Sequence, residues 1–202
     1  ELPNGWSSMD IGAVGVTGEA SYLNGAFNLL ASGSDIWETA DAFHLASRTL
    51  TGDGVIVARI AAMQYTDPWA KAGLMWREGT DPGAKYVFLA IAGHGSSMMQ
   101  WRTATGASTF SADGPEAKPP HWLKLMRRGD VFTGFVSADG TNWITSGSVT
   151  NALAETLSVG LALTAHNNAV LNSTLFQNVS VTAASSEKAE KSMNDSSRSE
   201  KF

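Results

Sequence analysis

The sequence contains no cysteine among its 202 residues. This absence excludes a disulfide scaffold and any zinc site with cysteine ligands, but it leaves the cellular compartment open, because a large core is stable without disulfides. Long apolar runs are also lacking, and none approaches the roughly 20 residues that a membrane-spanning helix requires. We therefore expect no insertion into a membrane.

Basic residues are in deficit: 14 Lys and Arg stand against 19 Asp and Glu, which gives a formal net charge of -5 at pH 7 with neutral histidine. A nucleic-acid-binding surface needs a basic patch or stripe, so we expect no nucleic-acid partner. Hydrophobic residues, by contrast, make up 43% of the chain and include 7 Trp and 8 Phe. Each buried aromatic side chain removes roughly 150–250 Å² of surface from water, which supplies the driving force for a folded core.

Short apolar or alternating runs recur along the sequence, and residues typical of turns separate them. Three such runs, at 42–50, 55–63 and 70–77, are separated by Thr-Gly-Asp-Gly and Thr-Asp-Pro, which favour chain reversal. Further runs are found at 21–31, 86–92, 97–103, 122–126, 131–137, 158–165 and 175–181. About twelve short strands without an amphipathic helix predict an all-β fold, a two-sheet antiparallel sandwich.

Two segments lack this pattern. Residues 105–120 include three prolines and show no hydrophobic period, so we expect a long loop there. Residues 183–202 are rich in Ser, Glu, Lys and Asn, with four acids against four bases, and we expect a disordered polar tail or linker. The folded domain is therefore expected at 1–182. Because the first residue is Glu1 rather than Met, we expect the chain to be a processed or excised piece.

Catalytic motifs are absent from the sequence. There is no Gly-x-Ser-x-Gly nucleophile motif, and the four histidines do not have the spacing of metal ligands. Cleavage of a glycosidic bond needs two carboxyl groups about 5 Å apart, or about 6.5–9.5 Å apart in inverting enzymes. The expected strands are almost free of acids, and the glutamates lie in or beside expected turns: Glu19, Glu38, Glu78, Glu116 and Glu155. We therefore predict that the protein is not an enzyme.

Polar side chains within the expected strands are the candidate ligand-binding residues. Side chains alternate between the two faces of a strand, so Lys71 shares a face with Arg77, and Gln100 shares one with Arg102. If all these faces belong to one concave sheet, the groove would be lined by His44, Lys71, Arg77, Gln100, Arg102 and His166, with Trp101 and Tyr86 as stacking planes.

Such a groove would suit a sugar, because sugars are bound by planar donor and acceptor groups beside an aromatic face in a preformed cleft. The arginines would additionally suit anionic sugars or carboxylates. Other interpretations stay open, since Arg and His on a sheet face are often solvated, paired with acids or bridging between sheets. Most of the tryptophans are expected in the core. Trp69, beside a proline in a turn, and Trp101, between Gln and Arg, are the better candidates for a sugar platform.

Three aspartates, Asp35, Asp41 and Asp53, raise the question of calcium. Loop aspartates and carbonyl groups can supply the oxygen ligands that this cation prefers. The same residues are also what a turn or a strand cap demands. We favour the turn interpretation and expect no cofactor, with structural calcium left as the alternative.

Several motifs of the chain occur together in a fixed order. They are Trp6 with Asp10-Ile11-Gly12, Gly33-Ser-Asp35-Ile36-Trp37, Asp41-Ala-Phe43-His44, Gly52-Asp53-Gly54, Ala70-Lys71-Ala72-Gly73, Gln100-Trp101-Arg102 and Thr164-Ala-His166-Asn167-Asn168. Together they resemble the bacterial domains of the concanavalin A-like lectin/glucanase superfamily, laminin-G-like jelly rolls similar to the regulator-of-enolase protein family. The resemblance covers residues 1–182. It implies a jelly-roll sandwich attached to neighbouring domains of a secreted or cell-surface protein, and hence an extracellular or surface location.

One position departs from the pattern of this family. Phe176-Gln177-Asn178-Val179 stands where Phe-Asp-Asn-Val is expected. If the aspartate serves a metal or a polar network in relatives, Gln177 cannot contribute the same charge.

The sequence leads to three hypotheses about function. The first is a non-catalytic carbohydrate-binding or adhesion module that binds a glycan or polysaccharide on one sheet face or on its loop rim. Such a module would raise the effective concentration of a partner domain near its polysaccharide. The second is a structural spacer or protein-interaction domain without a small ligand. The third, which we favour least, is a glycoside hydrolase or lyase.

Overall fold

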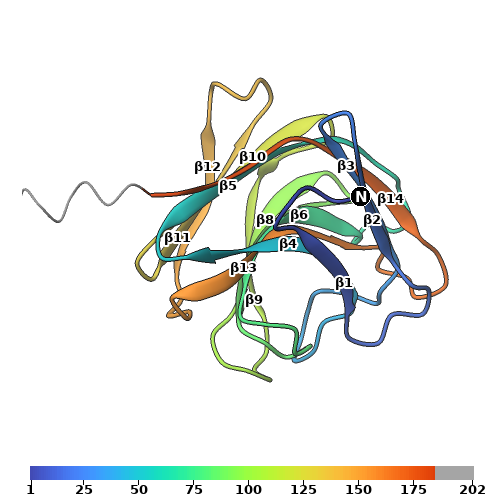
Figure 1. The fold of residues 1–202 in the computed structure, drawn as a ribbon, viewed down its shortest axis with the longest axis horizontal. Helices are drawn as coiled ribbons and strands as arrows, with labels where there is room; N and C mark the ends of the chain where they lie inside the picture. The colour runs from blue at the N-terminus through green and yellow to red at the C-terminus, as the bar shows by residue number, and fades with distance from the viewer. Residues whose placement is uncertain (185–202) are drawn as a thin grey trace, which may run out of the picture.

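The computed structural model describes residues 1–184 as two antiparallel β-sheets stacked face to face (Figure 1). In spatial order, the first sheet consists of β1 (Ser7–Ile11), β4 (Phe43–Thr51), β13 (Thr156–Thr164), β6 (Lys71–Arg77), β7 (Tyr86–Ala92), β8 (Ser96–Arg102) and β9 (Phe110–Glu116). The second sheet consists of β12 (Ile144–Thr150), β11 (Val131–Ser137), β10 (His121–Arg128), β5 (Gly54–Met63), β14 (Asn172–Ala183), β3 (Ala26–Ala31) and β2 (Glu19–Leu23). This architecture confirms the predicted two-sheet antiparallel sandwich.

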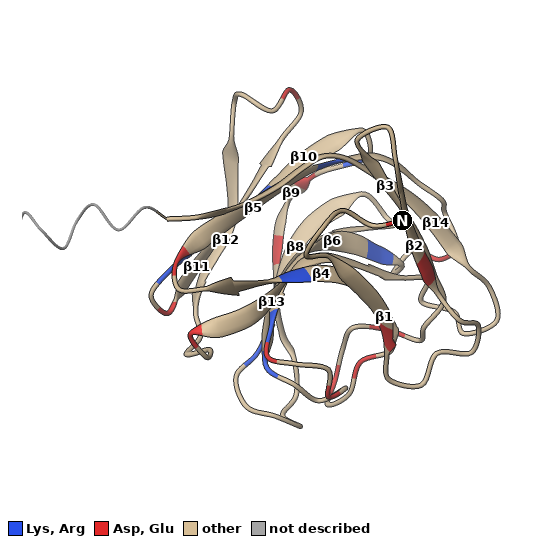
Figure 2. Ribbon diagram, in the orientation of Figure 1, with Lys and Arg blue, Asp and Glu red and all other residues tan. Residues whose placement is uncertain are grey.

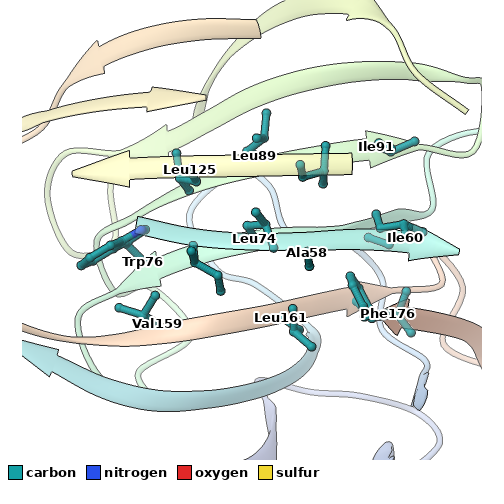
Figure 3. Close-up of a cluster of buried hydrophobic side chains, with 14 of the residues drawn as sticks. Ala58, Ile60, Leu74, Trp76, Leu89, Ile91, Leu125, Val159, Leu161 and Phe176 are labelled. Atoms are coloured by element: carbon teal, nitrogen blue, oxygen red, sulfur yellow. The ribbon is translucent and has the colours of Figure 1, made fainter. Parts of the chain in front are cut away.

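The main hydrophobic core lies between the two sheets. Every second residue of β6, namely Ala72, Leu74 and Trp76, belongs to this core. Figure 3 shows Leu74 and Trp76 of the first sheet beside Ala58 and Leu125 of the second. Period-two alternation produces this arrangement, because successive side chains of a strand point to opposite faces. Each fully buried large apolar side chain contributes about 1.5–3 kcal/mol to folding.

The opposite face of the first sheet is buried as well. Met75 and Phe88, on β6 and β7, belong to a second apolar cluster that is covered by Ile36 from the segment between β3 and β4. All residues of β6 and β7 are consequently buried. The apolar residues on both faces of 86–92 predict a strand that is covered on both sides or one that faces a groove. In the structure β7 is covered on both sides, and Ile36 from the loop between β3 and β4 packs over its outer face.

Two sequence predictions about strands were wrong. The run at 21–31 is a hairpin of β2 and β3, because Asn24 and Gly25 both adopt positive φ, 52° and 82°, and reverse the chain. An Asn-Gly pair is a strong hairpin signal and could have located this turn. Residues 105–120 are not one long loop, since β9 pairs with β8 at the edge of the first sheet. Strand β9 lacks hydrophobic alternation and contains Pro115, which a sheet tolerates at an edge.

The tail predicted at 183–202 lies, apart from its first two residues, outside the described part of the chain. Among residues 1–184, no helix has the length and hydropathy needed to cross a membrane.

Candidate functional site

A cleft of about 800 Å³ opens on the outer face of the first sheet, the face turned away from the second sheet. Strands β6 and β8 provide its floor with Lys71, Met98 and Gln100. The rim comes from four places: the segment between β3 and β4, the turn before β6, the edge strand β9, and the segment after β13 that carries His166. The cleft therefore joins segments that are far apart in the sequence.

Two exposed tryptophans stand at the rim. Trp37 is 37% exposed and Trp69 is 51% exposed, and both line the cleft. The turn that carries Trp69 is fixed by Asp67, whose Oδ1 accepts a hydrogen bond of 2.7 Å from the Trp69 backbone N–H. His94 packs edge-on against the Trp69 ring, with 4.7 Å between ring centroids. Large aromatic surfaces left open beside a cleft indicate a place for a ligand rather than for the core.

The floor presents an unpaired polar atom. Gln100 is only 2% exposed, yet its side-chain Oε1 has no hydrogen-bond partner among the described residues. A buried polar atom without a partner is uncommon in folded proteins and calls for an explanation. Because Gln100 lines the cleft, a ligand donor is a partner that Oε1 can accept from.

A chain of charged side chains runs along one wall. The Nζ of Lys71 donates to Oδ1 of Asp35, so the buried ammonium group is neutralised by a carboxylate of the rim. His166 lies between two acids: its Nε2 is 3.8 Å from Oδ2 of Asp35, and its Nδ1 is 3.8 Å from Oδ1 of Asp67. Neither distance is a direct hydrogen bond. His166 therefore lines the cleft beside two acids without a direct hydrogen bond to either.

Two rim residues have unusual backbone conformations. Glu38 has φ 47° and His166 has φ 52°, in the left-handed region that non-glycine residues seldom adopt. Both line the cleft. Residues in this region persist only when their surroundings hold them there, and they concentrate at ligand sites.

The structure places Arg77 and Arg102 away from the open cleft, in a closed ion-pair network. Both are 0% exposed, and both bond to the carboxylate of Asp41. Arg77 donates from Nη1 over 2.7 Å, while Arg102 donates to both oxygens over 2.8 and 2.7 Å. The ring of Tyr86 lies against both guanidinium groups, at 5.6 and 5.0 Å from its centroid.

Two buried guanidinium groups share one carboxylate here, and backbone carbonyl groups accept further hydrogen bonds from both. Arg102 donates to five carbonyl oxygens, of Trp37, Glu38, Pro82, Ala84 and Ala107. Burial lowers the pKa of Arg77. Burial acts the same way on Arg102, but the hydrogen bonds and charge of Asp41 outweigh it and raise its pKa. Both side chains remain protonated, as arginine does in proteins.

The prediction that Arg77 and Arg102 line a ligand groove is therefore wrong, and the alternative of pairing with an acid is correct. Apart from Nε of Arg77, which is buried without a partner among the described residues, their donors are used within the protein. Arg102 nevertheless acts on the cleft indirectly, because its Nη2 holds the carbonyls of Trp37 and Glu38 at 3.2 and 3.0 Å. It positions the rim segment that presents these two side chains.

Two more predicted residues face the other side of the first sheet. His44 pairs in register with Leu163 and shares the face of Ala46, toward the second sheet, where its Nδ1 lies 2.7 Å from Oδ1 of Asp10. Trp101 packs against the core between the sheets and stacks on Phe110, with ring centroids 5.7 Å apart. A residue one position along a strand points the opposite way. Neither side chain can join Lys71 and Gln100.

Of the predicted site residues, the structure thus brings together Lys71, Gln100 and His166, with Trp69 as the predicted platform. Sequence reasoning missed Trp37, Glu38 and Asp113 as parts of this site. It sought acids within expected strands, whereas Glu38 lies in a loop and Asp113 lies in β9, within residues that were predicted to form a loop. The run Gly33–Trp37 in the family motif was the available signal for Trp37.

No group of three or more His, Asp or Glu side chains within residues 1–184 is arranged to hold a metal ion. Each aspartate considered for calcium has another partner. Asp35 bonds to Lys71, Asp41 to both buried arginines, and Asp53 accepts from the Gly129 backbone N–H over 2.7 Å. Gln177, at the departure from the family motif, accepts a 2.8 Å hydrogen bond from Arg59.

No protein-family model matches this chain, and no curated protein matches its sequence. Solved structures do match its fold. A functionally unknown protein from Saccharomyces cerevisiae has a TM-score of 0.68 at 17% identity, covering 83% of this chain and 92% of that one. The carbohydrate binding module CBM66 from Bacillus subtilis has a TM-score of 0.56 at 16% identity, covering 89% and 96%.

An alginate lyase from Klebsiella pneumoniae has a TM-score of 0.58 at 10% identity, covering 90% of this chain and 96% of that chain. The fold is a concanavalin A-like jelly roll. Binding modules and enzymes both use this jelly roll, and identities this low establish the fold alone.

Proposed function

We propose that this jelly roll is a non-catalytic carbohydrate-binding module that holds a glycan in the cleft on the outer face of its first sheet. The observation that carries the proposal is the pair of exposed tryptophans, Trp37 and Trp69, flanking a floor where the buried Oε1 of Gln100 has no partner among the described residues. An aromatic plane beside a few fixed polar groups is the arrangement that sugar recognition requires.

The volume of the cleft is consistent with an oligosaccharide. Ligand sites of proteins measure about 300–1,000 Å³, and this one is about 800 Å³. Much of its lining is fixed in the free protein, since Arg102 holds the segment of Trp37 and Asp67 holds the turn of Trp69. Such a preformed site loses little conformational entropy on binding.

The setting we propose is a larger secreted or cell-surface protein. The motif resemblance to the regulator-of-enolase protein family supports this setting, as does the fold shared with the named carbohydrate binding module. In such a protein the module would keep neighbouring domains close to their polysaccharide and raise their effective concentration.

Catalysis is the alternative, and one observation favours it. Glu38 and Asp113 both line the cleft, so two acids lie beside the place proposed for the sugar. A third acid, Asp35, is engaged by Lys71. A hydrolase would release new reducing ends from a bound polysaccharide, whereas a binding module would not.

Affinity electrophoresis on a panel of polysaccharides, followed by titration of the best ligand, tests the proposal. We expect Trp69→Ala and Trp37→Ala each to weaken binding at least about tenfold, because aromatic anchors dominate such contacts. Phe110→Ala is the matched control. Phe110 is 52% exposed, like Trp69 at 51%, but it shares the face of Trp101, away from the cleft.

Three results would contradict the proposal. Unchanged affinity in both tryptophan variants would move the ligand elsewhere on the surface. Binding to no glycan would favour a structural spacer or protein-interaction domain. Release of reducing ends, abolished by Asp113→Asn or Glu38→Gln, would make the protein an enzyme.

A further inference from the structure

Acidic residues outnumber basic ones in the lining of the cleft. Asp35, Glu38 and Asp113 stand against Lys71 and against His166, whose ring lies 3.8 Å from Asp35 and from Asp67. Lys71 is 1% exposed and already donates to Asp35. Glu38 and Asp113 are both exposed and both line the cleft, and neither has a salt bridge among the described residues. Figure 2 shows several acidic segments, in red, on the loops that lie below the first sheet in that view.

The residues that could have received an anionic sugar are not available. Arg77 and Arg102 lie on the same two strands as the floor of the cleft, but both are 0% exposed and bound to Asp41. A uronate or sulfated sugar would bring further negative charge beside two carboxylates and find no guanidinium group to pair with. Like charges in such proximity disfavour binding.

The floor of the cleft gives a second, independent reason to expect a ligand with hydrogen-bond donors. Oε1 of Gln100 is an acceptor, it is buried, and it has no partner among the described residues. An amide oxygen can only accept, so its partner must be a hydrogen-bond donor, and a ligand in the cleft is one source of it. Walls and floor therefore select a ligand that is rich in donors.

We propose that the cleft selects an amino sugar in its protonated form, as in a polymer of glucosamine that is not N-acetylated. An ammonium group offers three donors and one positive charge, which match the carboxylates of Glu38 and Asp113 together with Oε1 of Gln100. The exposed rings of Trp37 and Trp69 add cation–π attraction. The chain's formal net charge of -5 favours the approach of a polycation. This inference rests on the proposed glycan-binding function and names the ligand class of that site.

Isothermal titration calorimetry at low salt, at a pH where the amine is protonated, tests this selection. The probes are an oligosaccharide of glucosamine, the fully N-acetylated oligosaccharide of the same length, and an oligogalacturonate. We expect the glucosamine oligomer to bind at least about tenfold more tightly than the acetylated one, because hydrogen bonds to charged groups are the stronger ones. The oligogalacturonate should not bind. Added salt should weaken the glucosamine complex and leave the acetylated complex unchanged.

Charge-removing variants locate the effect in the cleft. We expect Asp113→Asn to lower the affinity for the glucosamine oligomer about tenfold and to leave the affinity for the acetylated oligomer unchanged. Glu38→Gln should act in the same way. The matched control is Glu19→Gln on β2, an exposed glutamate of the second sheet, which should change neither affinity.

The outcomes separate this inference from the proposed function. Equal affinity for the two glucosamine-based oligomers, or tighter binding of the oligogalacturonate, overturns the amino-sugar selection but leaves a glycan-binding cleft. Tight glucosamine binding that Asp113→Asn and Glu19→Gln weaken equally shows a general attraction to an acidic surface and also overturns the selection. Binding of no oligomer or polysaccharide overturns both.

Discussion

The two ends of strands β6 and β8 carry similar residues in opposite surroundings. At the closed end, Arg77 and Arg102 enclose Asp41, and all three are buried. Away from the arginines the face is open: Lys71 at the start of β6 and Gln100 within β8, two residues before Arg102, form the floor of a cleft. Both ends belong to one continuous face of one sheet. The comparison teaches that a polar residue on this face bonds within the protein where the segment between β3 and β4 lies directly over it. Where that segment leaves the face open, the residue can contact a ligand.

The closed end exists because the segment between β3 and β4 carries its own carboxylate to the sheet. Asp41 sits where the two arginines converge, and Arg102 binds the backbone of Trp37 and Glu38 in addition. Burying two cations with one anion is costly unless every donor finds a partner. All three guanidinium nitrogens of Arg102 have partners, whereas Nε of Arg77 has none among the described residues. At the open end Asp35 of the same segment bonds to Lys71, and the cleft beside this pair stays uncovered.

The largest expected effect breaks the closed end. Arg102→Ala should lower the free energy of unfolding by about 3–5 kcal/mol, because it removes a buried partner of Asp41 and leaves backbone carbonyls unpaired. Urea unfolding followed by tryptophan fluorescence measures this loss. Arg48→Ala, at an exposed arginine on β4, is the control and should change stability by less than about 0.5 kcal/mol. If Arg102→Ala changed the free energy of unfolding as little as Arg48→Ala does, the ion-pair network would not stabilise the fold, and the closed and open ends would differ little.

An intermediate effect concerns Tyr86, whose ring covers the arginines and whose hydroxyl lies 3.0 Å from Oγ1 of Thr109. Tyr86→Phe should cost about 1 kcal/mol near neutral pH through the lost hydrogen bond. Burial, with the charge of Asp41, raises the pKa of Tyr86. The folded protein therefore keeps this phenol neutral at a pH where the unfolded chain ionises it.

The sign of the pH dependence follows from that difference. Above about pH 10 the wild-type protein should lose an additional 1.4 kcal/mol or so per pH unit that the Phe variant does not lose. The stability gap between them should close as the pH rises toward about 11 and then reverse. Tyr65→Phe, at a residue 66% exposed, is the control and should show no such crossing. Parallel stability curves for Tyr86→Phe and wild type would show that Tyr86 titrates freely in the folded state.

The smallest expected effect on stability comes from Gln100, in the open part of the face. Gln100→Met keeps the side-chain volume and removes the unpaired oxygen, so stability should stay constant or rise by about 1 kcal/mol. Binding of the best glycan should nevertheless weaken about tenfold, because the floor loses its acceptor. Thermal unfolding and calorimetry on the same sample measure both. A loss of more than about 2 kcal/mol of stability would show that the amide serves the fold, as the arginines do.

The strands show how far local pattern carries a prediction. The runs at 86–92 and 131–137 match β7 and β11 residue for residue, because apolar residues with turn residues at both ends define a strand locally. Strand β9 escaped detection because an edge strand buries little, and its polar residues give no alternation. That omission also hid Asp113 from the candidate site.

The site shows where local pattern stops. Alternation correctly placed Lys71 with Arg77 and Gln100 with Arg102, since their spacing within a strand is even. It could not relate His44 to them, because the relative face of two strands depends on the pairing register through β13. Nor could alternation show which acid pairs with which base. Asp41, 36 residues before Arg77, pairs with that arginine, and Asp35 pairs with Lys71.

The amino-acid sequence by itself determined the two-sheet sandwich and the alternation within each strand, because both follow from short-range periodicity and from turn residues. Only the tertiary structure decided which end of the outer face is sealed and which is open. That choice depends on where a covering loop places Asp35, Trp37 and Asp41 over strands that follow it in the chain. Contacts between residues so far apart in the chain depend on strand order and register, and neither can be read from a short stretch of the sequence.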